Sequence, residues 1–152
     1  MTQGSERKNF PILIVDDEPD IVEALINYLD DYEVDFAYDA DSALHKVASG
    51  KFKIVLADIV MPGLDGIELL RRIKNINPGI QVIMMTGHTT LMRASESMQD
   101  GALRYLLKPF DDIKEVDEAI EEAIQKIRGW ESVFRKTILT KKGHQDIEGE
   151  SA

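Results

Sequence analysis

The sequence contains no cysteine, and this excludes disulfide scaffolds, thiolate catalysis and cysteine-ligated zinc or iron–sulfur centres. Basic residues are in the minority, with 18 Lys and Arg against 28 Asp and Glu, for a formal net charge of −10. Surfaces that coat nucleic acid or bind anionic lipid need clustered cations, so we expect neither direct nucleic-acid binding nor membrane docking. No apolar run approaches the ~20 residues that span a bilayer, and the polar start resembles no secretion signal. We therefore expect a cytoplasmic location.

The length and composition are those of one globular domain. The chain has 152 residues, of which 43% are hydrophobic and 30% charged. We expect residues 1–9 to be disordered and residues 10–128 to form the domain. Residues 129–152 should form a helical extension and a polar, disordered tail from Lys141 onward. Gly129 could end the last helix, or Trp130 and the apolar residues after it could prolong that helix, and the pattern leaves both alternatives open.

The apolar residues alternate between two kinds of pattern along the chain. Short, almost continuous apolar runs are typical of buried strands, and helical spacing of three and four residues follows each run. The pattern predicts strands at residues 12–15, 34–36, 54–57, 80–85 and 103–107. Five such β–α units indicate an α/β fold, a doubly wound five-stranded parallel sheet with helices on both faces.

Polar residues follow four of these strands at the point where each strand ends. Asp16 and Asp17 follow the first strand, Asp58 the third, Thr86 the fourth and Lys108 the fifth. Ligands of open parallel sheets bind at the carboxyl ends of the strands. The sequence therefore predicts one crevice that holds three carboxylates, a hydroxyl and an ammonium.

This set of side chains favours phosphoryl chemistry on a magnesium site. Three adjacent carboxylates repel one another, and a divalent cation relieves that repulsion. Oxygen ligands without His or Cys favour Mg²⁺, which accompanies phosphoryl transfer. Asp58 is the best candidate for a nucleophile that forms an aspartyl-phosphate, and the neighbours Asp16 and Asp17 are better placed to hold metal.

Together these residues resemble the receiver domain of the response regulators of two-component signalling. The resemblance covers residues 10–128, and it includes Met61-Pro62-Gly63 and Lys108-Pro109-Phe110. It implies a CheY-like fold with strand order 2-1-3-4-5. It also implies that Asp58 accepts a phosphoryl group from the phosphohistidine of a sensor histidine kinase or histidine phosphotransfer protein.

The same resemblance implies a role for each residue of the crevice. Asp17 and Asp58 would ligate Mg²⁺ directly, Asp16 mainly through water, and Val60 through its backbone carbonyl. Thr86 and Lys108 would contact the phosphoryl group, and Tyr105 matches the aromatic residue that turns inward when Thr86 moves. The only chemistry implied is the domain's own phosphorylation and dephosphorylation.

The resemblance further implies a downstream protein effector. It would bind the surface made by the helix at 91–99, the strand at 103–107 and the last helix. A phosphorylation-dependent homodimer is a second expectation, although Gly101-Ala102-Leu103-Arg104 departs from the pattern of the DNA-binding branch that dimerises there. Thr86-Gly87-His88 is more similar to receivers of the NtrC type or of hybrid kinases.

Two alternatives remain at this point. A Mg²⁺-dependent phosphatase of the haloacid-dehalogenase kind also uses an Asp nucleophile and a Lys, but it usually carries an acid where this chain has Val60. The chain could also be the regulatory fragment of a larger transcription factor or hybrid kinase, because the two dozen residues after the domain are too few for a DNA-binding module.

Overall fold

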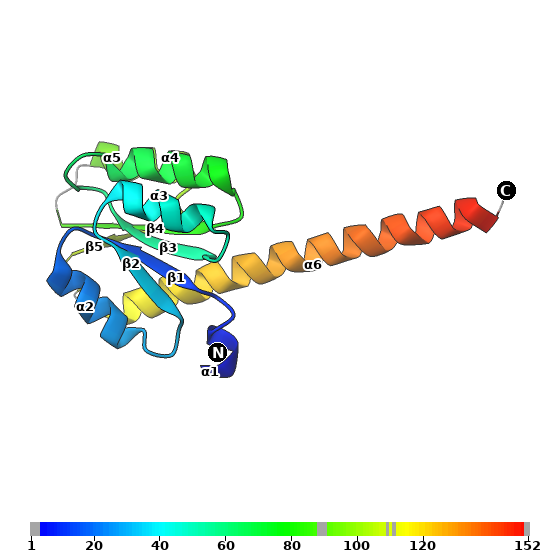
Figure 1. Cartoon of the computed structure of the whole chain (residues 1–152), viewed down its shortest axis with the longest axis horizontal. Helices are drawn as coiled ribbons and strands as arrows, with labels where there is room; N and C mark the ends of the chain where they lie inside the picture. Colours follow the sequence, from blue (N-terminus) through cyan, green and yellow to red (C-terminus); the bar gives the residue numbers. More distant parts are fainter. Residues whose placement is uncertain (1–3, 88–90, 109, 111, 151–152) are drawn as a thin grey trace.

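The computed structural model describes residues 4–87, 91–108, 110 and 112–150, without the side chains of residues 5, 91 and 141–150. A five-stranded parallel sheet forms the centre of the molecule, with strand order β2-β1-β3-β4-β5 (Figure 1). This confirms the predicted architecture. The strands are β1 (Ile12–Val15), β2 (Val34–Ala37), β3 (Ile54–Asp58), β4 (Gln81–Thr86) and β5 (Arg104–Leu107).

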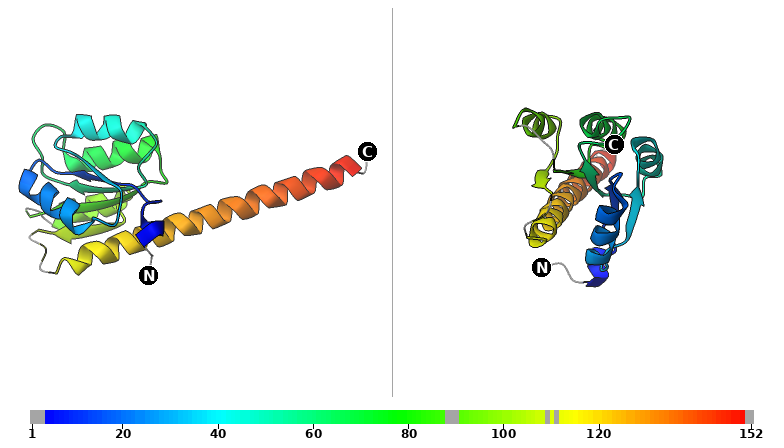
Figure 2. Two further views of the ribbon diagram at one scale, coloured as in Figure 1. Left: turned by 60° about the horizontal axis from the view of Figure 1, so that its bottom comes forward. Right: turned by 90° about the vertical axis from the view of Figure 1, so that its left-hand side faces the viewer.

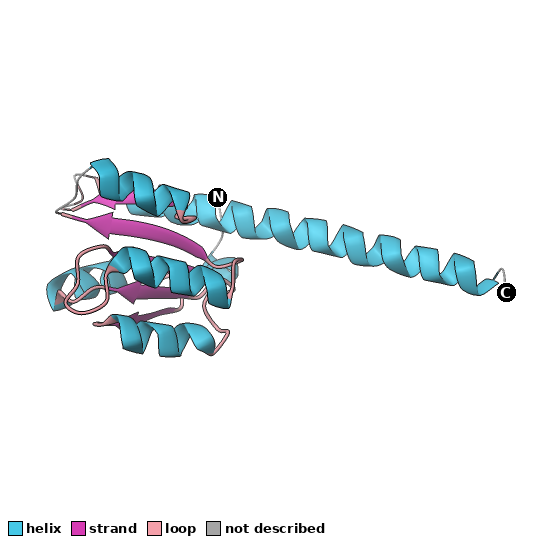
Figure 3. Ribbon diagram, turned by 90° about the horizontal axis from the view of Figure 1, so that it is seen from above, coloured by secondary structure: helices cyan, strands magenta, loops and turns pink. Residues whose placement is uncertain are grey.

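Helices cover both faces of the sheet (Figure 3). Apart from the short α1 (Gly4–Arg7), they are α2 (Pro19–Tyr28), α3 (Ala40–Ala48), α4 (Gly66–Ile76), α5 (Leu91–Gln99) and α6 (Lys114–Glu150). Helices α2 and α6 pack on one face, where Leu25 and Ile120 meet Ile14 of β1 in the first core. Helices α3 and α4 bury Val47 and Leu70 against the other face.

The burial of each strand follows its place in the sheet. Every residue of β1, β3 and β4 is buried, whereas the edge strands β2 and β5 are partly exposed. A parallel strand with helices on both sides has no solvent face, and this explains the continuous apolar runs of the sequence. The buried centre fixes where β1, β3 and β4 end, and so positions the side chains that follow them.

Two aspartates begin the helices of the second face. Asp39 caps α3 by accepting a hydrogen bond from the amide of Ser42 at 2.8 Å. Asp65 caps α4 in the same way, with 2.7 Å between its Oδ1 and the amide of Ile67. Such caps satisfy backbone donors that the first turn leaves unpaired. The cap of α4 matters for function because it holds the end of the loop that follows Asp58.

The structure differs from the predicted disorder at the N-terminus. Within residues 1–9, helix α1 is tied to the domain by two ion pairs, each of 3.1 Å: Arg7 with Asp31, and Glu6 with Arg128. Phe10, directly after this segment, is buried in the first core. These contacts explain the order, because a terminal segment is ordered where side chains hold it down.

At the C-terminus, α6 continues through Gly129 to Glu150, far beyond the edge of the sheet (Figure 2). Gly129 therefore does not end the last helix, and the backbone of residues 141–150 is helical where the sequence predicted a disordered tail. A single Gly in a helix costs only about 1 kcal/mol, which the good helix formers before it, Gln125, Lys126 and Arg128, help to offset. Beyond the domain the apolar residues lack cover: Trp130 and Phe134 are 60% and 65% exposed. No described helix, α6 included, is long and apolar enough to cross a membrane.

Candidate functional site

The carboxyl ends of β1, β3, β4 and β5 meet at one edge of the sheet. Asp58 and Thr86 are the last residues of β3 and β4, and Lys108 directly follows β5. They lie around a cavity of about 490 Å³, lined by Asp17, Glu18, Ile21, Asp58, Val60, Thr86, Gly87 and Lys108. The structure thus brings together the strand-end residues that the sequence singled out, as the topology requires.

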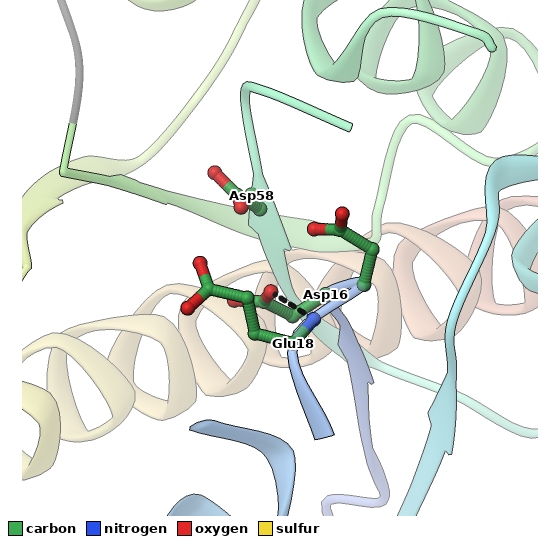
Figure 4. Close-up of side chains that lie close together, drawn as sticks. Asp16, Glu18 and Asp58 are labelled. Carbon is green, nitrogen blue, oxygen red and sulfur yellow. Dashed lines mark hydrogen bonds between the residues drawn. The ribbon is translucent and has the colours of Figure 1, made fainter. Parts of the chain in front are cut away.

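Four acidic side chains gather at this edge, and Figure 4 labels three of them, Asp16, Glu18 and Asp58. One carboxylate oxygen from each of Asp16, Asp17, Glu18 and Asp58 lies within 4.8 Å of those of the others. Asp16 and Asp58 form the buried part of the cluster, at 0% and 3% exposure, and Glu18 lies at its outer edge. Glu18 was not among the site residues predicted from the sequence, although its position directly after the acidic pair was a usable signal.

Lys108 is the cation of this cluster. Its ammonium contacts Asp16, lies 3.1 Å from Oδ2 of Asp58, and lies 3.5 Å from Oε1 of Glu18. Burial would lower the pKa of Lys108, but its hydrogen bonds to Asp16 and Asp58 and their charges outweigh burial, so the net shift is upward. Lys108 therefore keeps its positive charge at neutral pH.

Asp16 is an acidic side chain that is buried inside the protein. Burial raises the pKa of Asp16, against the lowering effects of the hydrogen bonds from Lys108 and from the amide of Glu18. That amide donates to Oδ1 of Asp16 at 2.9 Å. Asp16 is thus anchored by the backbone on one side and by the ammonium on the other, at the cost of desolvation.

The backbone around Asp58 is held just as closely. The amide of Val60 donates to Oδ1 of Asp58 at 3.1 Å, which leaves Oδ2 on the side of Lys108. The amide of Gly66 donates to the carbonyl of Ile59 at 2.9 Å and brings the start of α4 against the same loop. A Cβ atom at position 66 would lie only 2.1 Å from the carbonyl oxygen of Asp58, so this approach requires glycine.

Comparison with known proteins decides the family. Residues 12–121 match the response regulator receiver domain. The chain belongs to this family. The match covers most of the chain and includes every residue predicted for the site.

Similar proteins include a transcriptional regulatory protein and solved receiver domains. The transcriptional regulatory protein ZraR of Salmonella typhimurium is 37% identical over 125 residues, which is 80% of this chain and 28% of ZraR. A CheY-like receiver domain from Methanospirillum hungatei is 31% identical with a TM-score of 0.72, covering 79% of this chain and 98% of that one. The beryllofluoride-activated NtrC4 receiver domain dimer is 30% identical with a TM-score of 0.71, covering 77% and 98%. The chain thus spans about a quarter of the length of the curated relatives that it matches.

The two predicted switch residues of the receiver domain lie on adjacent strands. Thr86 is 1% exposed at the edge of the cavity, and it pairs in register with Leu107 of β5. Tyr105 pairs with Met84, is half-buried, and packs against the second core beneath α3 and α4. Thr86 and Tyr105 thus lie on β4 and β5, the last two strands of the sheet, with Thr86 at the cavity and Tyr105 on the edge strand.

Proposed function

We propose that this receiver domain accepts a phosphoryl group on Asp58. The observation that carries the proposal is the contact between Oδ2 of Asp58 and the ammonium of Lys108, 3.1 Å long, at the edge of a cavity open to a donor. A nucleophilic carboxylate with a fixed cation beside it can receive a phosphoryl group and stabilise the charge of that group.

The transfer has a simple balance of bonds and charges. A carboxylate oxygen of Asp58 forms a bond to phosphorus, while the bond from phosphorus to the donor histidine nitrogen breaks and its electron pair returns to that nitrogen. Lys108, already at the site, compensates the negative charge that arrives with the phosphoryl oxygens. Attack of water on phosphorus later breaks the bond from phosphorus to the Asp58 oxygen, which restores the carboxylate and releases inorganic phosphate. The domain's own chemistry is limited to these two steps.

The donor set fits a hard divalent cation. The four carboxylates offer only oxygen, and the single ammonium of Lys108 leaves an excess of negative charge among them. We expect Asp16, Asp17, Asp58 and the carbonyl of Val60 to hold Mg²⁺. The bound ion would supply positive charge for the phosphoryl oxygens.

The signal would leave the site through Thr86 and Tyr105. Thr86 would donate a hydrogen bond to the phosphoryl group together with Lys108, and Tyr105 would turn inward as Thr86 moves. The surface that this changes includes α5, β5 and the first half of α6. It carries exposed apolar side chains, Met92 at 72% and Leu107 at 58%, which suit a downstream protein effector.

The partners follow from the family. The donor would be a sensor histidine kinase or a histidine phosphotransfer protein. A phosphorylation-dependent homodimer gains support from the NtrC4 receiver, which is a dimer when activated by beryllofluoride. Because its curated relatives are several times longer, this chain could serve as the regulatory part of a larger regulator. Family membership decides against the phosphatase alternative.

The test of this function is covalent labelling of Asp58. Wild-type protein incubated with acetyl phosphate and MgCl₂ should gain the mass of one phosphoryl group, measured on the intact protein. Asp58→Asn should gain none, and Asp41→Asn, which removes an exposed carboxylate that does not line the cavity, should behave as wild type. Equal labelling of wild type and Asp58→Asn would refute the assignment.

A further inference from the structure

Glu18 has no evident structural duty at the start of α2. It precedes Pro19 and occupies the N-cap position, but its side chain makes no capping hydrogen bond. The carboxylate is 61% exposed, so it does not contribute to the core. Glutamate is not among the residue types favoured as N-caps, which makes its presence here unexplained by helix formation.

The Glu18 side chain nevertheless lies beside the acidic cluster and Lys108. Its own amide is bound to Oδ1 of Asp16 at 2.9 Å, which fixes the backbone from which the side chain projects. Its Oε1 lies 3.5 Å from the ammonium of Lys108, and the side chain lines the cavity beside Asp58 (Figure 4). Glu18 is therefore an exposed member of the lining of the cavity that would hold the ion and receive the donor.

The charge count shows what such a residue can do. Four carboxylates surround one ammonium, so the site carries a formal charge of −3, and without Glu18 this charge would be −2. Negative charge at the cavity attracts cations and repels anions, and the phosphodonors of a receiver domain are anions. The same carboxylate must therefore act in opposite directions on the ion and on the donor.

We propose that Glu18 is a specificity residue of this site, which strengthens the binding of the divalent cation and slows phosphorylation by small anionic donors. This inference rests on the proposed function. By its charge, Glu18 favours occupation of the site by the cation before a donor approaches. Because the side chain is largely exposed, its effect is moderate in size and weakens as salt is added.

The first test measures the ion alone. Titration of metal-free protein with MgCl₂ by calorimetry should give a dissociation constant about fivefold higher for Glu18→Gln than for wild type at low salt. Glu18→Asp, which keeps the charge, should stay within about twofold of wild type. The matched control Glu23→Gln removes the same charge from an exposed position of α2 and should leave the affinity unchanged. A merely structural role of Glu18 would not produce this ranking.

The second test measures the donor. At saturating MgCl₂, Glu18→Gln should be phosphorylated by acetyl phosphate about threefold faster than wild type, followed by intact mass. Unchanged Mg²⁺ affinity in Glu18→Gln, or an equal loss in Glu23→Gln, overturns the inference whatever the labelling shows. If wild type gains no phosphoryl group, the proposed function fails, while a weakened affinity confined to Glu18→Gln still supports the role of Glu18 toward the cation.

Discussion

The ammonium of Lys108 lies 3.1 Å from Oδ2 of Asp58, and the same nitrogen contacts Asp16, 92 residues earlier in the chain. One cation thus links the ends of three strands. The two carboxylates are almost fully buried, and the side chain of Lys108 is 8% exposed. In the absence of a bound metal, this lysine provides the compensating charge that the buried acids need.

We predict that Lys108→Met destabilises the metal-free protein. Methionine keeps the apolar stem but leaves the buried carboxylates of Asp16 and Asp58 facing one another, which should lower the free energy of unfolding by about 3 kcal/mol at neutral pH. Urea denaturation in EDTA measures this loss, and added MgCl₂ should recover part of it. Lys51→Met, which breaks an exposed pair with Glu33, serves as control and should leave the midpoint unchanged. Equal stability of Lys108→Met and wild type would show that the pair has no net effect.

Glycine at position 66 should be indispensable, whereas glycine at position 129 should not. A Cβ at Gly66 would lie 2.1 Å from the carbonyl oxygen of Asp58 and 2.6 Å from Cα of Ile59, so Gly66→Ala must displace the loop that carries the site. We expect a loss of about 3 kcal/mol in the free energy of unfolding, together with weaker Mg²⁺ binding. Around Gly129, nothing lies within 4 Å of such a Cβ. Gly129→Ala should therefore raise stability by about 0.5 kcal/mol, measured in the same urea series.

The sequence was sufficient to predict the sheet and the inner part of the site. Continuous apolar runs identify buried parallel strands, and topology then brings Asp16, Asp58 and Lys108 together whatever their rotamers. The position of Glu18 after Asp16 and Asp17 was a signal for the site, but its approach to Lys108 also depends on the bond between its amide and Asp16, which orients the backbone there. No periodicity of apolar residues encodes such a bond.

The contacts of the N-terminal segment were beyond the reach of the sequence for a related reason. Arg7 and Glu6 hold α1 in place by ion pairs. The sequence does not show which distant residue pairs with an isolated charged side chain in a polar segment. At the other end, the sequence left open whether Gly129 ends the last helix or the helix continues through Trp130, and in the structure α6 continues. The helix-forming residues around Gly129 offset the cost of one glycine in the helix.

Alkaline titration should reveal the contact between α2 and α6. The phenol of Tyr28 donates to Oδ2 of Asp117 at 2.5 Å, and this hydrogen bond is the main cause that raises the pKa of Tyr28 from 10.0 to about 12. Because the pKa is raised on folding, the stabilisation is fully present below pH 10 and is lost as the pH rises towards 12. The tyrosinate absorbance of Asp117→Ala should therefore include one group that titrates nearer pH 10 than in wild type.

Tyr28→Phe provides the control for that titration. It should remove one high-pKa group from the absorbance curve, while Tyr32, whose pKa burial raises to about 12, continues to titrate. The stability difference between wild type and Tyr28→Phe should shrink above pH 10. A constant difference across this range would mean that the hydrogen bond to Asp117 is not formed in solution.

Truncation should separate the domain from its helical extension. The described contacts of residues 130–140 with the domain are peripheral, such as the exposed pair between Lys53 and Glu131 at 3.6 Å. A chain that ends at Gly129 should therefore keep its free energy of unfolding within about 1 kcal/mol of the full chain and should label at Asp58 as before.

A second truncation tests whether the buried first part of α6 is needed for folding. Ending the chain at Ala119 removes the buried side chains Ile120, Ala123, Ile124 and Ile127 from the first core. Each large apolar side chain contributes about 2 kcal/mol by burial, and three of them together approach the total stability of a small domain. Circular dichroism should show this shorter chain unfolded. If it instead folds and is labelled at Asp58, the packing of α6 on the sheet is not required for folding, contrary to what its burial indicates.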